Sequence, residues 1–240
     1  GLGFVKECLH VGVHTKLREA ITLANESRAE LERLLSEHAI AFRHRPAGKL
    51  VVTRSSRQLS RLAKSAAIKR EMGIEIANVN KDQCFEHCSG LRTSMHDIVG
   101  GVYAPGDTVG DARRFTEALA LYTSERYGLK IKLKRKIECL LTDGKQVVGV
   151  RTDREDFSAD AVVVCMGSAT STFLKGYGVN VPILPVKGYS IAIPAQENTA
   201  PISLTDVDNK IVFSKLDSEV RIAGLSDFGE AGCDIDPERV

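Results

Sequence analysis

Apolar residues recur at helical spacing near the start of the chain. Residues 15–39 place an apolar side chain every three, four or seven positions, with acidic and basic residues between them: Leu17, Ile21, Ala24, Leu31, Leu34 and Leu35. This pattern predicts one amphipathic helix, about 37 Å long at 1.5 Å per residue. A second predicted helix begins at Ser55 or Ser56, both N-cap residue types, and ends before Gly73.

The segments around the second helix are short and bounded by turn residues such as Pro46-Ala47-Gly48, which predicts strands. The expected strands are 41–45, 49–53, 74–79 and 100–104. Asn80 is expected to cap a short helix that ends near Cys88, and Asp111 begins a further helix.

The second half of the chain is dominated by strand patterns. Segment 130–133 alternates lysine with aliphatic residues, and segments 137–141 and 146–152 flank an Asp143-Gly144 turn typical of a hairpin. Segment 161–166 is continuously apolar, which predicts a strand buried on both faces, as in a parallel sheet covered by helices. Further strands are expected at 183–193, 211–214 and 220–223. The order of elements predicts α/β and α+β parts that share one chain.

Composition describes an ordinary globular protein. The 240 residues include 33 basic and 31 acidic side chains, a formal net charge of +2, which excludes a strongly basic arm or an acidic tail. Six cysteines without a visible secretory signal favour a reducing, cytoplasmic setting. The chain opens with Gly1-Leu2-Gly3-Phe4 and lacks an initiating methionine, so we expect a fragment of a longer protein.

Common catalytic signatures are absent from the sequence. It contains no Walker A loop, no G-x-S-x-G, no H-E-x-x-H and no paired C-x-x-C. Cys84, His87 and Cys88 are close together on a predicted helix, with His96 as the nearby candidate for a fourth metal ligand. Buried cysteines on one helix face are the favoured interpretation, because structural zinc sites usually space their ligands more tightly. We therefore predict no metal site and no catalytic side-chain constellation.

Basic residues gather in two stretches. Residues 41–70 hold nine lysines or arginines and no acidic residue, and a second run occupies 130–136. Nucleic-acid binding, attraction to an anionic lipid surface and a plain solvated face are the alternatives. Aromatic residues are only 5% of the chain, so nucleic acid is not expected as a partner.

The apolar segment 161–166 ends in Gly167-Ser168, after which a helix is expected to begin. A glycine there lets backbone approach a ligand closely, and free N–H groups at a helix start favour a phosphate or another anion. The alternative is a core strand that ends in a turn.

Three segments together resemble a known family, the D-amino-acid oxidase-like FAD oxidoreductases. Segment 137–168 resembles the family's second flavin-contacting segment, and 100–107 with Gly110-Asp111 resembles its strand-turn-helix unit. Segment 185–194 contains Pro-Val-Lys-Gly-Tyr-Ser, which resembles the corresponding strand of the D-amino acid dehydrogenases of the small-subunit type. The resemblance extends from about residue 13 to 233, while the family's GxGxxG segment and C-terminal flavin segment are not in the chain.

The resemblance implies a two-part map. Residues 1–39 and 106–178 would form a partial, Rossmann-like FAD-binding domain, and residues 40–105 and 179–240 a mixed-sheet substrate domain. It places the cofactor FAD against four residues: Ile137, Met166, Gly167 and Ser168. It places Tyr189 and, less directly, Tyr103 on the substrate side.

The resemblance also implies oxidative deamination of a small D-amino acid, D-alanine-like, to a 2-oxo acid and ammonia. Electrons would pass to a quinone or respiratory chain, and the basic stretch 41–70 would be a docking surface at the inner face of the cell membrane. The span alone is expected to hold FAD weakly and to be inactive. A glycine- or sarcosine-type amine oxidase fragment and a non-catalytic binding module are the alternatives.

Overall fold

The computed structural model describes residues 13–229, 232 and 234–237. The chain divides into two compact units, Gly1–Tyr122 with Ser190–Leu225 and Thr123–Tyr189 with Ser226–Val240, and each is described by itself. Gly1-Leu2-Gly3-Phe4, residues 1–12 of the expected flavin-binding part and Cys233 lie outside the described residues. The two-domain map given above uses different boundaries and stays a prediction.

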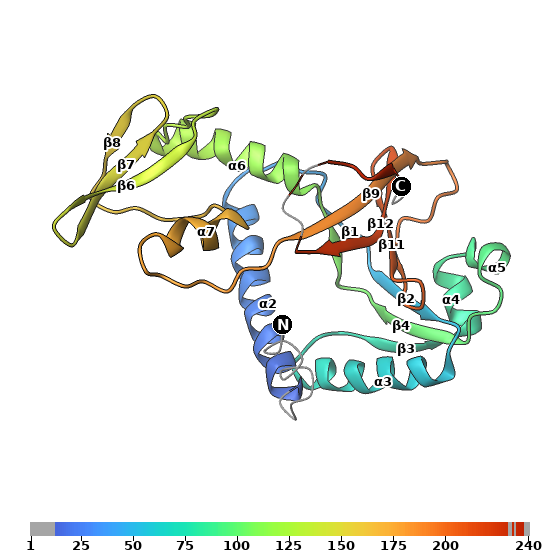
Figure 1. Ribbon diagram of the computed structural model, residues 1–240. Helices are drawn as coiled ribbons and strands as arrows, with labels where there is room; N and C mark the ends of the chain where they lie inside the picture. Colours follow the sequence, from blue (N-terminus) through green and yellow to red (C-terminus); the bar gives the residue numbers. More distant parts are fainter. Residues whose placement is uncertain (1–12, 230–231, 233, 238–240) are drawn as a thin grey trace. The chain divides into compact units, whose positions relative to one another are not determined.

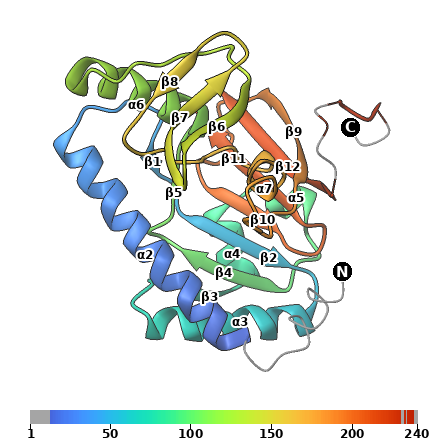
Figure 2. The same ribbon diagram turned by 60° about the vertical axis from the view of Figure 1, so that its left-hand side comes forward.

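The helices of the first unit lie close to where the sequence pattern predicts them. The long helix α2 (Val13–Glu37) passes close to α3 (Ser56–Glu71) (Figure 2). It buries Ile21, and its Arg18 pairs with Glu71 at 2.7 Å. Ser55 caps α3 by accepting a hydrogen bond from the Gln58 amide. The chain turns away at Gly73, whose φ of +82° is a left-handed conformation that suits glycine.

Two further helices, α4 (Lys81–His87) and α6 (Ala112–Tyr127), are also capped as expected. Asn80 forms a reciprocal capping box with Gln83 at the start of α4, and α5 (Leu91–Ser94) follows. The side chain of Asp111 accepts a hydrogen bond from the Arg114 amide at the start of α6. Local side-chain chemistry therefore sets these helix boundaries.

A seven-stranded mixed sheet runs through the chain. Its strands lie in the order β3-β4-β2-β10-β11-β12-β9, with β2 and β10 parallel (Figure 1). Their bounds are β2 (Lys49–Thr53), β3 (Ala77–Asn80), β4 (Gly100–Ala104), β9 (Val186–Pro194), β10 (Ser203–Asp206), β11 (Ile211–Leu216) and β12 (Glu219–Phe228). A separate pair joins β1 (Arg45–Pro46) to β5 (Thr108–Val109). The predicted mixed sheet is confirmed, whereas segment 41–45 forms a strand only at its end.

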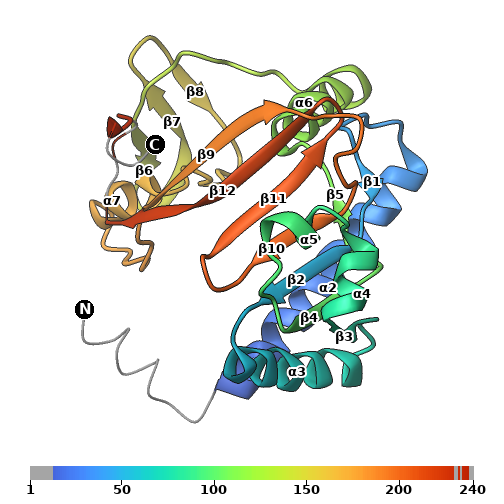
Figure 3. The same cartoon turned by 90° about the vertical axis from the view of Figure 1, so that its right-hand side faces the viewer.

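The core lies on both faces of the β3-β4-β2 part of the sheet. Leu50 and Val52 of β2 are fully buried on one face, where they cluster with residues of α4 and α5 (Figure 3). The other face packs against α3, where Ala66 clusters with Val102 and Ala104 of β4. The alternation of side chains along β2 and β4 thus supplies two apolar layers from the same strands.

The second unit is built on a three-stranded antiparallel sheet. It contains β6 (Ile137–Asp143), β7 (Gln146–Thr152) and β8 (Asp156–Ser158), and α7 (Ala169–Lys175) follows. The predicted hairpin is confirmed, and Gly144 in its turn has a φ of +57°.

Two predicted strands in the second unit are wrong. Segments 130–133 and 161–166 carry no strand, and Val163 is 85% exposed where a doubly buried strand was expected. A strand needs a neighbour for its backbone hydrogen bonds, and no strand among the described residues pairs with either segment.

Candidate functional site

Two of the predicted flavin-contacting residues line one pocket of the second unit. Ile137 begins β6, Met166 ends the apolar segment 161–166, and both border a pocket of about 470 Å³. Leu140, Val150 and Phe173 complete a wall that is mainly apolar. The hairpin therefore positions Ile137 next to a segment about thirty residues further along the chain. This volume and lining are typical of a pocket for part of an organic cofactor.

Gly167 and Ser168 follow Met166, where the chain turns into α7, and they do not line the pocket. Gly167 has a φ of +57°, and a Cβ added there would meet no heavy atom within 4 Å. Ser168 precedes α7 and makes no side-chain capping bond. Glycine suits this position because its backbone is left-handed and can be approached closely.

Two of the N–H groups after Gly167 form hydrogen bonds within the turn that begins α7. The Ala169 amide donates to the Met166 carbonyl at 3.2 Å, and the Thr170 amide donates to the Gly167 carbonyl at 3.1 Å. The Met166 amide in turn donates to the Thr170 hydroxyl at 3.2 Å. Local bonds therefore occupy the amides of Ala169 and Thr170 at the start of the seven-residue helix α7, and an anion at this helix start stays a prediction.

Tyr189 lies in β9, in the unit that also contains the pocket. Its hydroxyl is buried and forms no well-oriented hydrogen bond with any residue in the described part of the chain. Burial raises the pKa of Tyr189, and the nearby carboxylate of Asp227 raises it further. The neighbouring Lys187 ammonium donates to the Asp234 carbonyl at 3.2 Å. Tyr189 therefore keeps its hydroxyl protonated at physiological pH, with the Asp227 carboxylate as its polar neighbour.

Tyr103 lies in β4 of the first unit and has different surroundings. Its ring stacks on His87 with centroids 3.9 Å apart. Gly48 leaves room for the ring, since a Cβ there would lie about 2.7 Å from the Tyr103 hydroxyl oxygen. The structure thus brings Ile137 and Met166 to one pocket, with Gly167 and Ser168 next in the chain after Met166, and it stacks Tyr103 on His87.

Of the two cysteines near His87, Cys84 is a buried residue of α4, as the sequence predicts, whereas Cys88 is half-buried and caps the end of the helix. Cys84 is fully buried, and burial raises the pKa of its thiol to about 11. Across the residues that the structure describes, no group of three His, Cys, Asp or Glu side chains is arranged to hold a metal ion. Protonated thiols in an apolar layer explain the Cys84–Cys88 spacing as core packing.

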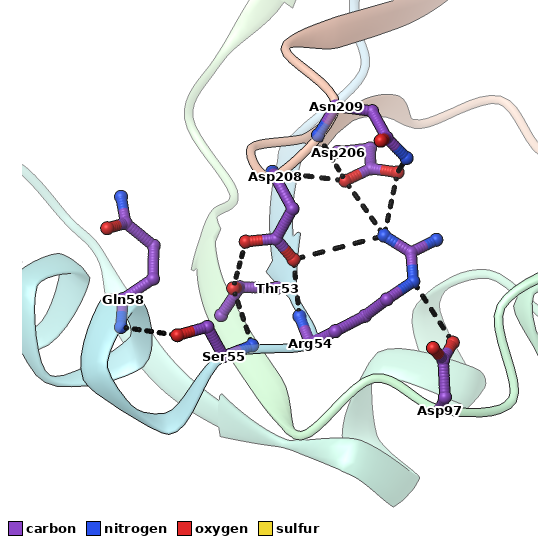
Figure 4. Close-up of polar contacts among 8 residues, drawn as sticks. All are labelled: Thr53, Arg54, Ser55, Gln58, Asp97, Asp206, Asp208 and Asn209. Carbon is purple, nitrogen blue, oxygen red and sulfur yellow. Dashed lines mark hydrogen bonds and ion pairs between the residues drawn. The ribbon is translucent and has the colours of Figure 1, made fainter.

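One polar cluster of the first unit was missed by the sequence analysis. Arg54 donates two hydrogen bonds to the carboxylate of Asp206, at 3.0 and 3.1 Å, and a third to Asp97 at 3.0 Å (Figure 4). Asp208 accepts from the Thr53 hydroxyl and from the Arg54 amide, and the Asn209 side chain donates to Asp206. The cluster ties the β10–β11 turn to the end of β2.

Asp206 is the buried centre of this cluster, with an exposed fraction of 1%. Burial by itself would raise the pKa of Asp206, but the hydrogen bonds from Arg54 and Asn209 outweigh it and hold the pKa below its usual value. Both carboxylate oxygens are occupied, so the cluster stabilises the fold and offers no group for catalysis. The only feature of the sequence that could have indicated this cluster is an acidic residue, Asp206, at the end of a short strand.

Some of the basic side chains in the stretch 41–70 are paired with carboxylates from elsewhere in the chain. Arg54 is only about one quarter exposed and faces three carboxylates, and Arg43 pairs with Asp217 at 2.9 Å. The exposed cations of this stretch include three on α3: Arg57, Arg61 and Lys64. Arg54 therefore does not belong to a docking surface. No helix in the described part of the chain combines the length and apolarity that a membrane crossing requires.

Comparison with known proteins identifies relatives along nearly the whole chain. Residues 7–240 match the sequence profile of the family described as "FAD dependent oxidoreductase", DAO. The D-amino acid dehydrogenase of Dechloromonas aromatica is 33% identical over 246 residues, which cover 100% of this chain and 59% of that protein. The D-amino acid dehydrogenase of Azorhizobium caulinodans is 34% identical over 221 residues, covering 91% of this chain and 53% of that protein.

Solved structures show the same fold. Glycine oxidase from Geobacillus kaustophilus superposes with a TM-score of 0.81 at 20% identity, covering 91% of this chain and 59% of that one. L-proline dehydrogenase from P. horikoshii superposes with a TM-score of 0.71 at 15% identity. The superposition covers 93% of this chain and 58% of that one. The chain spans a little more than half the length of the relatives that it matches.

Proposed function

Because the chain belongs to the DAO family of FAD-dependent oxidoreductases, we propose that it forms part of an enzyme that oxidises D-amino acids. The observation that supports this most directly is the similarity to D-amino acid dehydrogenases at about one third identity across nearly all of its residues. The proposed substrates are small and D-alanine-like, and the products are a 2-oxo acid and ammonia.

The apolar pocket of the second unit fits part of the family's cofactor. Ile137 and Met166 would form its wall, and Gly167 and Ser168 would lie along the cofactor where no Cβ projects from Gly167. When bound, FAD would accept a hydride from the substrate α-carbon, after which the imine hydrolyses. The proposed role of this chain's residues is to hold the cofactor and orient it toward the substrate.

Tyr189 is proposed to contribute to the substrate side. Its hydroxyl is buried, stays protonated and lacks a well-oriented partner among the described residues. A hydroxyl in this state can donate a hydrogen bond to a carboxylate or carbonyl oxygen of a ligand. Tyr103 is proposed with less direct support, because its ring is already stacked on His87.

The electron acceptor is proposed to be a quinone or a respiratory-chain component, reached through peripheral contact with the inner face of the cell membrane. The exposed cations of α3 support this contact, since anionic lipid attracts clustered lysine and arginine.

Substrate profiling of the protein that carries this chain, loaded with FAD, tests the proposed activity. We expect dye reduction that depends on D-alanine and not on L-alanine, with formation of a 2-oxo acid. A preference for glycine or sarcosine would support the amine-oxidase alternative, to which the glycine oxidase fold similarity belongs. Failure to bind flavin at all would leave a non-catalytic module.

A pair of variants tests the pocket itself. Met166→Glu should weaken FAD binding about a hundredfold, because it buries a charge in an apolar wall. Val148→Glu places the same charge on β7 outside the pocket lining and should leave flavin affinity unchanged. Flavin fluorescence after desalting measures both, and equal retention in the two variants would contradict the assignment of this pocket.

A further inference from the structure

A small pocket of about 190 Å³ lies between α3 and the face of the sheet that this helix covers. Leu62 and Ala66 of α3 line one side, and Val51 of β2 and Val102 of β4 line the other. The volume equals that of about six water molecules at about 30 Å³ each, which admits a compact organic molecule and excludes a nucleotide. Every lining residue belongs to the first unit, and none lines the pocket assigned to FAD.

Both signs of charge also line this pocket. Lys49 comes from β2, Lys69 from the last turn of α3, and Asp107 from the turn after β4. Lys49 precedes Val51 by two residues, so both side chains lie on the same face of the sheet. Lys49 also lies opposite Ala104 in β4, three residues before Asp107. The register therefore brings a cation and an anion to one end of an apolar pocket.

The charged groups of this pocket have no protein partner within the described part of the chain. Lys49, Lys69 and Asp107 are half-buried, and the side chain of none of them forms a hydrogen bond or an ion pair with a described residue. The Ser65 hydroxyl, one helical turn before Lys69 on the same wall, has no described partner either. Partly buried charges without counter-ions cost free energy, so a ligand that pairs them would be stabilised here.

The combination of charges matches a zwitterion. A ligand carboxylate can accept hydrogen bonds from the two lysine ammonium groups, while a ligand ammonium can donate to Asp107 and to the Ser65 hydroxyl. A simple carboxylate or a phosphate would use the lysines but would face the negative charge of Asp107. A compact amino acid pairs both signs of charge and places its aliphatic side chain against Val51 and Val102.

We propose that this pocket binds a small aliphatic α-amino acid, with its carboxylate at Lys49 and Lys69 and its ammonium at Asp107. No bond of the ligand is made or broken there, and the proposal does not depend on flavin chemistry. Binding to the folded chain alone stabilises that state, so such a site couples the stability of the first unit to the concentration of an amino acid.

Calorimetric titration of the full chain with 2-aminoisobutyrate tests the proposal. This amino acid is achiral and has no hydrogen on its α-carbon, so the oxidation proposed above cannot consume it. We expect saturable binding at one site. In 2,2-dimethylpropanoate and in tert-butylamine, a methyl group replaces the ammonium or the carboxylate, respectively. Each should bind about tenfold or more weakly, because charge-assisted hydrogen bonds are lost.

Three variants assign the binding to this pocket. Lys69→Met keeps most of the aliphatic stem and should weaken binding of 2-aminoisobutyrate about 10- to 100-fold. Lys64→Met removes an exposed lysine of the same helix and should leave the affinity unchanged. Asp107→Asn should weaken 2-aminoisobutyrate but strengthen 2,2-dimethylpropanoate, since that carboxylate no longer meets a negative charge. This opposite shift keeps the test decisive if Lys69→Met unfolds.

Three results would overturn the proposal. Equal affinity in the Lys69 and Lys64 variants would place the binding elsewhere in the chain. Equal affinity for the amino acid and its two analogues would show that the paired charges are not recognised. The absence of saturable binding up to about 10 mM, a concentration at which even a millimolar Kd is visible, would show that there is no such site.

Discussion

At the residue scale, the pair formed by Arg54 and Asp206 dominates the polar interactions of the first unit. Replacing Asp206 by Asn leaves Arg54 with a weaker partner at a buried position, and we expect the free energy of unfolding to fall by about 3 kcal/mol. Asp97→Asn removes an exposed carboxylate from the same guanidinium and should cost less than about 1 kcal/mol. Urea denaturation followed by circular dichroism measures both variants.

The same pair predicts a pH dependence with a defined sign. Because the pKa of Asp206 is lowered in the folded chain, its contribution to stability is present above the ordinary carboxyl pKa of 3.8. It is lost as the pH falls through the lowered value. The difference in unfolding free energy between the wild-type chain and Asp206→Asn should therefore be largest near neutrality and shrink below pH 3.8. A difference that stays constant on acidification would show that the charge of Asp206 is not the cause.

At the scale of elements, α3 presents the cations proposed to meet an anionic membrane. Arg57, Arg61 and Lys64 are exposed, at intervals of four and three residues that place them on one side of the helix. Reversing all three charges should weaken binding to phosphatidylglycerol vesicles about a hundredfold at moderate salt, at about 1 kcal/mol per cation.

The matched control for this prediction changes the same net charge elsewhere. Reversing Lys130, Lys132 and Lys134, in the second unit, should leave most of the binding intact. Vesicle cosedimentation measures both. If the two triple variants lose binding equally, attraction depends on net charge alone and α3 is not a docking surface.

The sequence predicted helices and turns well where a few neighbouring residues determine where the element begins or ends. Ser55 and Asn80 cap their helices through bonds three residues away, and Gly144 closes the hairpin. Segments 130–133 and 161–166 failed because a strand also needs a partner, and their apolar residues carry no information about whether one is present. Periodicity therefore identifies what a segment is able to form, while pairing decides whether it forms.

At the scale of the whole molecule, the same distinction explains which parts of the candidate site could be predicted. Ile137 and Met166 were expected to contact one cofactor on the basis of family resemblance, and they line one pocket. The Arg54–Asp206 pair joins residues 152 positions apart, and no local pattern indicates such a contact. The amides after Gly167 were predicted free because a helix start exposes them in general, but those of Ala169 and Thr170 bond to carbonyls of the same turn.

The two units also differ in how much apolar surface they bury. Among the described residues, every fully buried hydrophobic side chain belongs to the first unit, whereas the buried residues of the second unit include Thr152 and Thr170. Backbone opening costs less where little apolar surface is lost to water, so the second unit should open first.

Hydrogen exchange followed by mass spectrometry tests this difference within one chain. Peptides that cover β2 and β4 should exchange about a hundredfold more slowly than peptides that cover β6 and β7, corresponding to roughly 3 kcal/mol in opening free energy. Both pairs are antiparallel and well bonded, so the comparison isolates burial from hydrogen-bond number. Equal protection of the two hydrogen-bonded pairs would mean that the units open together, and that the core around Leu50 and Val52 stabilises the hairpin as well.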